Sequence, residues 1–300
     1  MASTAQSSPA SAAFTAAVVG IALFSCMDAV MKGLSIGIGA YNAVFWRNLI
    51  GVVLSGILYA GARCPWPEAA TLRLHLVRGA VSSVMAITFF WGLARVPMAE
   101  AISLAFIAPL VALYLAAALL GEPVGRRAIL ASLIGFSGVL VIVVMRGGNG
   151  GQSDLAGAAA ILVSAMLYAY NIILMRQQAL VAGPVEIAFF QSVIVAACLS
   201  VAAPFLAVVP GPEHLPALTL SAFLAIASLL LLGWAYARAE AQHLAPVEYT
   251  SLIWAAMLGY LVFGEEVGAA TVVGAALIVT GCVIAARSGR IQTSTAEAAL

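Results

Sequence analysis

Residues 78–124 read RGAVSSVMAITFFWGLARVPMAEAISLAFIAPLVALYLAAALLGEPV, and the pattern of this stretch returns 143 positions later. The second copy includes residues 235–267, AYARAEAQHLAPVEYTSLIWAAMLGYLVFGEEV. The two copies align without a gap, and their identical positions fall in loops as well as in apolar runs. Examples are the pairs Trp91 and Trp234, Arg95 and Arg238, Gly121 and Gly264, Glu122 and Glu265, and Gly138 and Gly281. This register indicates a duplicated structural unit rather than a shared apolar composition.

The composition of the chain predicts that it lies in a lipid bilayer. Hydrophobic residues make up 64% of the 300 residues and charged residues only 8%, and the mean hydropathy is +1.09. A water-exposed surface usually needs roughly 25% charged residues. The net charge of +1 and the lack of a basic run give no indication of a nucleic-acid partner.

The cysteines and histidines do not indicate a metal site, a disulfide framework or a bound cofactor. Cys26, Cys198 and Cys282 fall in apolar runs and Cys64 in a predicted loop, with no CxxC motif and no histidine at ligand spacing. Each cysteine is therefore expected to act as a small buried hydrophobic residue. The sequence also lacks a GxxxxGK[ST] loop, which excludes a built-in ATPase of that class.

Ten apolar runs are long enough to cross a hydrocarbon core about 30 Å thick, which needs roughly 20 residues per helix. Glycine-rich and proline-containing breaks separate them. The predicted spans are residues 12–32, 41–62, 76–95, 98–120, 127–146, 156–176, 185–208, 216–238, 244–263 and 268–286.

The basic residues predict that both termini are cytoplasmic. In that orientation the inner side receives Arg63, Arg73, Arg78, Arg126, Arg127, Arg176, Arg238, Arg287 and Arg290, and the outer side only Lys32, Arg95 and Arg146. Each copy has an odd number of helices, so the second copy enters the membrane from the opposite side. The predicted fold class is therefore an all-α integral membrane protein with ten transmembrane helices in two inverted five-helix repeats.

The chain is expected to divide at the ends of these repeats. Residues 1–13 and 287–300 are predicted to be solvated tails, the first of them disordered. The first repeat covers residues 14–146 and the second 156–286, with a linker loop at 147–155.

The stretch at residues 78–124 resembles the drug/metabolite transporter superfamily, specifically its EamA-type ten-helix branch. The shared features are Arg78-Gly79 at the start of a helix, Phe89-Phe90-Trp91 at its end, Pro109 inside the next helix, and Gly121-Glu122 after it. The resemblance implies metabolite export or exchange, with amino-acid exporters of the YddG type among the bacterial members. It also implies that helices 1 to 4 and 6 to 9 surround a central cavity, with helices 5 and 10 outside it.

Pro109 is predicted to kink the helix over residues 98–120. Proline has no N–H, so the carbonyl of Ala105 loses its usual partner. The matching position in the second half is Leu252, while Pro246 lies near a helix start, where proline disturbs little. The sequence therefore gives no basis for symmetrical kinks.

Asp28 and Arg47 are ionisable residues inside predicted spans, where a charge costs about 2.5 to 3.5 kcal/mol at the bilayer centre. They lie at comparable depths in the first two helices, with Lys32 one turn beyond Asp28. We expect Asp28 to pair with Arg47, either as a structural link that also shapes the outer pathway or as a site for a charged substrate group. The matching residues are Asn171 and Phe190, so this role is not duplicated.

Several polar and aromatic residues are further cavity candidates, each with a structural alternative. Tyr168 and Asn171 share a helix face and can bind a zwitterionic or amide-bearing solute, or hydrogen-bond between helices. Glu248 is either linked to a proton or cation, or an interfacial carboxylate, and Trp91 lines the cavity or anchors the interface. The complete set of candidates is Phe24, Asp28, Arg47, Ser83, Phe90, Trp91, Ser103, Phe106, Tyr168, Asn171, Gln191, Glu248, Tyr249, Ser251 and Trp254.

Two repeated features are expected to serve structure. Glu122 and Glu265 are predicted to cap the helix that follows each of them. Glycines in the fifth and tenth helices permit close helix packing, within one chain or between protomers of a homo-oligomer. They are Gly135, Gly138, Gly274 and Gly281.

The sequence thus predicts a secondary transporter that exports small metabolites, above all amino acids, across the bacterial inner membrane by alternating access. Its partners would be the substrate and the lipid bilayer. The alternative within transport is uptake or exchange of a nucleoside-like metabolite. An intramembrane enzyme is a remote alternative, because the histidines are scattered and the sequence has no HExxH motif and no paired carboxylates on a mid-membrane helix face.

Overall fold

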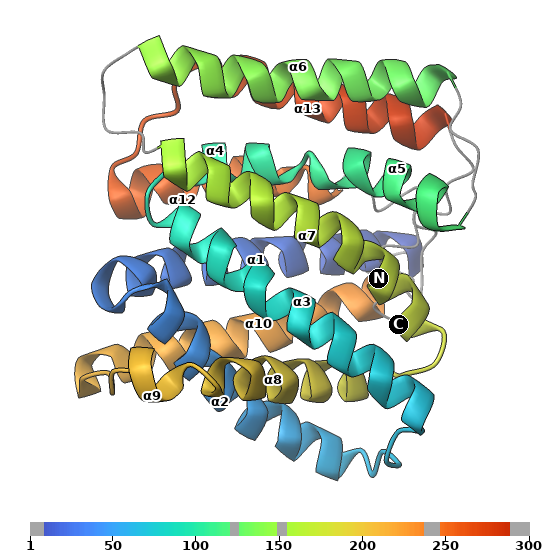
Figure 1. Cartoon of the computed structure of the whole chain (residues 1–300), viewed down its shortest axis with the longest axis vertical. Helices are drawn as coiled ribbons and strands as arrows, with labels where there is room; N and C mark the ends of the chain where they lie inside the picture. Colours follow the sequence, from blue (N-terminus) through green and yellow to red (C-terminus); the bar gives the residue numbers. More distant parts are fainter. Residues whose placement is uncertain (1–8, 121–125, 149–154, 237–246, 289–300) are drawn as a thin grey trace, which may run out of the picture.

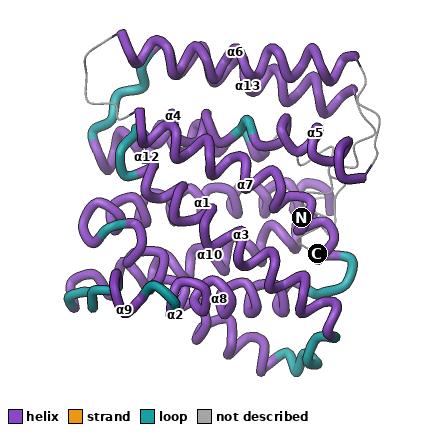
Figure 2. Tube along the Cα trace, viewed as in Figure 1, coloured by secondary structure: helices purple, strands orange, loops and turns teal. Residues whose placement is uncertain are grey.

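The structure, a computed structural model, describes residues 9–120, 126–148, 155–236 and 247–288. These residues fold as a bundle of roughly antiparallel helices, and none of them forms a strand (Figure 2). The expected all-helical class is therefore confirmed for the described part of the chain. Six segments of that part are long and apolar enough to cross a membrane, and further apolar helices are 10–17 residues long.

The helices of the first half are α1 (Pro9–Ile38), α2 (Ala40–Gly61), α3 (Ala69–Leu93), α4 (Met98–Ala105), α5 (Ala108–Leu120) and α6 (Arg126–Gly148). Those of the second half are α7 (Leu155–Ala179), α8 (Pro184–Ser200), α9 (Ala203–Leu206), the short 3₁₀ helix η1 (Pro212–His214), α10 (Leu215–Tyr236), α12 (Thr250–Phe263) and α13 (Ala269–Ser288).

The helix boundaries differ from the predicted spans in three places. The span expected over 98–120 is divided into α4 and α5 beside Pro109, where a kink was predicted, and the span over 185–208 is divided into α8 and α9, where none was. In the second case Pro204 cannot donate to the carbonyl of Ser200, where α8 ends. Residues 9–13 belong to α1 rather than to a disordered tail, because the alanine-rich start of the run favours helix.

Helix packing follows the duplication. Among the most extensive contacts, α1 packs on α10, α3 on α7, and α6 on α13, with the last pair at the top of Figure 1. A shift of 143 residues carries α1 onto α7 and α3 onto α10. The α1–α10 contact and the α3–α7 contact are therefore equivalent under the duplication, and each joins the two halves of the chain.

The glycines of α6 and α13 repeat one close contact twice. A Cβ atom on Gly138 would lie 2.5 Å from the carbonyl oxygen of Gly274, and one on Gly281 would lie 2.6 Å from that of Ala131. The 143-residue shift carries Gly138 onto Gly281 and Ala131 onto Gly274. These glycines therefore pack α6 closely on α13 within one chain.

The bundle has two distinct ends. The start of α1 and the end of α13 lie at the same end, on the right of Figure 1. We call this the terminal end. The end of α1 and the end of α12 lie at the opposite side, which we call the far end.

Candidate functional site

The helix over residues 98–120 breaks beside Pro109. Helix α4 ends at Ala105 and α5 begins at Ala108. Between them the N–H of Ile107 donates to the oxygen of Leu104 at 3.2 Å, a tighter turn than an α-helix makes. Because Pro109 cannot donate to the carbonyl of Ala105, the break follows directly from the sequence.

The second half breaks at the equivalent position without a proline. Residues 247 and 248 are helical, Tyr249 is a turn, and α12 begins at Thr250. The N–H of Leu252 donates to the oxygen of Tyr249 at 3.2 Å. Tyr249 lies 143 residues after Phe106, so the breaks are symmetrical although the prolines are not. Pro246 lies outside the described residues.

The two breaks meet in space. The ring centroids of Phe106 and Tyr249 are 5.4 Å apart with the rings tilted by 43°. The thiol of Cys282, on α13, donates to the oxygen of Phe106 at 3.3 Å. The fold thus brings two of the predicted candidates, Phe106 and Tyr249, into contact, with Glu248 next to Tyr249 in the chain.

Two further candidates have accessible side chains. Tyr168, on α7, is 36% exposed. Arg47, on α2, is half-buried. Neither side chain is fully enclosed by the protein.

Asp28 and Arg47 do not form the predicted ion pair, so that prediction was wrong. The Asp28 side chain is 2% exposed, and its Oδ1 has no hydrogen-bond partner. Arg47 Nη1 instead donates to Met27 Sδ at 3.3 Å, and its guanidinium carbon lies 5.6 Å from the centroid of the Phe90 ring. The two charges interact electrostatically without contact.

The predicted serines donate their hydroxyl protons to backbone oxygens three or four positions earlier in the chain. Ser83 donates to the oxygen of Gly79 at 2.7 Å, Ser103 to that of Ala99 at 2.6 Å, and Ser251 to that of Glu248 at 2.7 Å. Helical serines commonly satisfy themselves in this way.

The amide candidates differ in their bonding. Asn171 is buried and accepts a hydrogen bond from Ser82 at 3.4 Å, which matches its interhelical alternative. Gln191 Oε1 is buried without a partner.

Three aromatic candidates, Trp91, Trp254 and Phe24, lie outside the Phe106–Tyr249 pair. Trp91 stacks with Arg95, whose guanidinium carbon is 3.5 Å from the ring centroid. Trp254 packs against a small apolar cluster of Ala17, Ile21, Ala235 and Val247. Phe24 is 45% exposed. Among the residues that the structure describes, none of the three is in ring contact with Phe106 or Tyr249, which are paired with each other at the two helix breaks.

A polar cluster at the far end was not predicted. Lys32 forms an ion pair with Glu265 and also donates to the oxygen of Val96 at 2.6 Å. Glu265 Oε2 accepts the N–H of Met98, the first residue of α4, at 2.7 Å. Glu265 therefore caps α4 and not the helix that follows it, which corrects the prediction. Lys32, counted above as an outer loop charge, is buried in α1 at 3% exposure.

A second polar cluster lies at the terminal end, where α3 and α8 begin and α7 ends. His75 Nε2 lies 3.0 Å from Glu186 Oε1, and Gln178 bonds both His75 and Arg78. His75, Arg78 and Gln178 are all buried. Arg78 was counted as an inner-side charge, and Gln178 on α7 binds it inside the bundle. The sequence signal for this cluster is the presence of His75, Arg78 and Gln178 in otherwise apolar helices.

The chain matches a known family twice over. The EamA-like transporter family covers residues 11–144 and again residues 155–287. This chain belongs to the EamA-like transporter family. The family lies within the drug/metabolite transporter superfamily, so the suspected resemblance at that level is confirmed. Its members are multi-pass membrane transporters rather than enzymes.

Similar proteins carry different substrates. The pseudopaline exporter CntI of Pseudomonas aeruginosa is 29% identical over 278 residues, which cover 91% of this chain and 95% of that protein. A riboflavin transporter of Rhizobium johnstonii is 27% identical, covering 90% of this chain and 89% of its own length. An S-adenosylmethionine uptake transporter of Rickettsia bellii is 24% identical, with coverage of 85% and 86%.

A solved structure has the same fold. One crystal structure aligns with 94% of this chain and 99% of its own length, at 21% identity and a TM-score of 0.60. Agreement over nearly the whole of both chains supports the helix arrangement described above.

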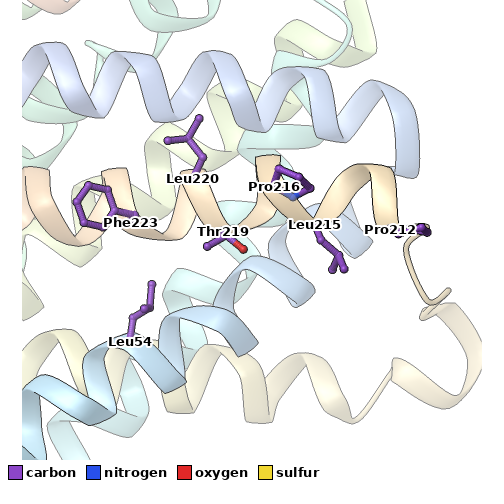
Figure 3. Close-up of a pocket in the computed structure, with 7 residues that line it drawn as sticks. All are labelled: Leu54, Pro212, Leu215, Pro216, Thr219, Leu220 and Phe223. Carbon is purple, nitrogen blue, oxygen red and sulfur yellow. The ribbon is translucent and has the colours of Figure 1, made fainter.

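Two surface grooves lie away from the candidate residues. One runs between α2 and the start of α10 and is lined by Leu54, Thr219, Phe223 and neighbouring apolar side chains (Figure 3). The other runs between α1 and α10, beside Val19 and Trp234. Neither groove includes a candidate cavity residue, and in a membrane transporter apolar grooves of this kind suit lipid acyl chains.

Proposed function

We propose that this chain is a secondary transporter that exports small metabolites, with amino acids as its main substrates, across the bacterial inner membrane. The observation that carries the proposal is the meeting of Phe106 and Tyr249, two helix breaks at equivalent positions. Secondary transporters commonly build their substrate sites from broken helices at the interface of two repeats, where irregular backbone lines a cavity.

Alternating access follows from the duplicated architecture that we propose. Ten membrane helices form two inverted repeats, residues 14–146 and 156–286, with both termini cytoplasmic. The equivalence of the α1–α10 and α3–α7 contacts and the paired glycine contacts of α6 and α13 support this arrangement. Two units related in this way can exchange conformations, so that the central cavity opens first to one side and then to the other.

The chemistry around the cavity favours amino acids. Phe106 and Tyr249 provide aromatic surface, and we assign Asp28 on α1 and Arg47 on α2 to the same site as a pair of opposite charges. A small molecule with an apolar part and a zwitterionic part matches this combination. The similarity to a pseudopaline exporter supports the outward direction.

Uptake or exchange of a nucleoside-like metabolite is the second candidate function. Similarity to a riboflavin transporter and to an S-adenosylmethionine uptake transporter favours it. The rings of Phe106 and Tyr249 can stack on a planar heterocycle.

Efflux from proteoliposomes separates the two candidates. The purified protein is reconstituted into liposomes that contain a panel of labelled amino acids and nucleosides, with and without a pH gradient. Release is compared with that from loaded liposomes without protein. We expect release of at least one amino acid above the control. Release of nucleosides alone would support the second candidate, and release of neither class would contradict both.

A further inference from the structure

Asp28 and Arg47 are two opposite charges that the fold holds close together but out of contact. Asp28 is 2% exposed on α1, and its Oδ1 has no hydrogen-bond partner. Arg47, on α2, makes one hydrogen bond in the described structure, from Nη1 to Met27 Sδ. Met27 directly precedes Asp28 in the chain, so the guanidinium lies beside Asp28 without pairing with it. Both are therefore poorly satisfied in an apolar bundle.

Such an arrangement is unfavourable unless something completes it. A buried charge without a partner loses its hydration and gains little in return, whereas direct pairing would recover part of that loss. The fold prevents direct pairing because the Arg47 guanidinium is directed to Met27 and to the face of Phe90, 5.6 Å away. Binding sites commonly keep such unsatisfied groups ready for a ligand.

The orientation of Arg47 leaves the right donors available. A guanidinium that lies over an aromatic face still presents its N–H groups at its edge, and two of them match the two oxygens of a carboxylate. Asp28 offers carboxylate oxygen to a cationic donor. An α-amino acid carries a carboxylate and an ammonium group on one carbon atom, so it satisfies both residues at once.

We infer that Arg47 binds the carboxylate and Asp28 the ammonium group of a zwitterionic substrate. This inference rests on the proposed function and adds the residues that select the substrate class. The site is single, because the equivalent positions hold Asn171 and Phe190. Phe190 instead stacks on His75 with ring centroids 4.8 Å apart. One substrate is therefore expected per chain, held on the side of the first repeat.

Three related probes test the two charges on the unmodified protein. They are L-phenylalanine, 2-phenylethylamine, which lacks the carboxylate, and 3-phenylpropanoate, which lacks the ammonium group. The aromatic ring is kept constant. In proteoliposomes we expect L-phenylalanine to be released and to be competed by other zwitterionic amino acids. Neither one-charge analogue should be released or compete at the same concentration.

Two variants test the residues, with a matched control. Asp28→Asn and Arg47→Met should each raise the KM for L-phenylalanine by about 30-fold or more, the usual effect of truncating one partner of a buried charge contact. Arg47→Lys should have an intermediate effect, because it keeps the charge but loses the bidentate geometry. The control is Asn48→Ala, which removes a local bond to the oxygen of Val44 and should leave KM unchanged.

The outcomes separate this inference from the proposed function. If the protein releases amino acids but both variants keep the KM of the unmodified protein, the inference is overturned and the proposed function stands. Equal transport of a one-charge analogue also overturns it, and that result does not depend on whether a variant folds. If no amino acid is released at all, the proposed function itself fails.

Discussion

Lys32 on α1 and Glu265 beyond α12 form an ion pair that joins the two halves of the chain at the far end of the bundle. Their side chains are 4% and 17% exposed. Glu265 also accepts the N–H of Met98, and Lys32 donates to the oxygen of Val96, so the pair connects the ends of α1, α3, α4 and α12. The ion pair therefore ties the two halves of the chain together at this end.

We predict that Lys32→Met lowers the free energy of unfolding by about 3 kcal/mol, because it leaves the Glu265 carboxylate partly buried without its cation. The double variant Lys32→Met with Glu265→Leu should lose less, since the Glu265 carboxylate is then removed together with its cation. Thermal unfolding of the purified protein in detergent provides the comparison.

The control is a pair on the surface. His214 and Glu213 lie 3.6 Å apart with side chains 31% and 68% exposed. Glu213→Gln should change stability by less than about 1 kcal/mol, as exposed ion pairs contribute little. A double variant that is less stable than Lys32→Met alone would show that Glu265 is held mainly by its cap on Met98.

The duplication made much of the fold predictable. The 143-residue register and the apolar runs placed the helices, and Pro109 located the break between α4 and α5. The break at Tyr249 was not predictable, because Leu252 replaces the proline and nothing local forbids a continuous helix. The ring of Tyr249 packs against Phe106 of the other repeat at this break. Tertiary contacts of this kind override the intrinsic helix propensity of the local sequence.

The polar contacts were harder to predict than the helices. Asp28 and Arg47 looked like a pair because they share a depth on neighbouring helices, yet Met27 and Phe90 hold the guanidinium away. Lys32 and Glu265 are 233 positions apart, and no periodicity links them. A sequence gives the depth of a charge along a helix, whereas its partner depends on how each helix is rotated.

The paired glycines of α6 and α13 give a second prediction. Gly138→Ala and Gly281→Ala should each lower the free energy of unfolding by about 1 to 3 kcal/mol, because each new methyl group would meet a backbone carbonyl that cannot move independently. Gly33→Ala is the control, since a Cβ on Gly33 has no atom within 4 Å. It should be neutral or slightly stabilising. Equal behaviour of all three variants in thermal unfolding would contradict the close contact.

The buried cluster at the terminal end gives a third prediction. Gln178 bonds both His75 and Arg78, so Gln178→Leu leaves two buried polar groups unsatisfied and should cost about 1 to 3 kcal/mol of stability. The neighbouring Gln177 is exposed, and Gln177→Leu provides a control with the same change of side chain. The expected result is a lower unfolding midpoint for the first variant only. Similar midpoints would mean that water replaces the lost amide.

Pro109 gives the last prediction, which uses the second half of the chain as an internal reference. Because Tyr249 breaks its helix with Leu252 in place of a proline, the break at Phe106 does not depend on Pro109 alone. Pro109→Ala should therefore keep transport and change stability by less than about 1 kcal/mol. Val111→Pro, inside α5, is the contrasting variant and should cost about 3 kcal/mol or more. If Pro109→Ala abolished transport while the protein unfolded at the normal temperature, the proline itself would be what keeps α4 and α5 apart, and the equivalence of the two breaks would be lost.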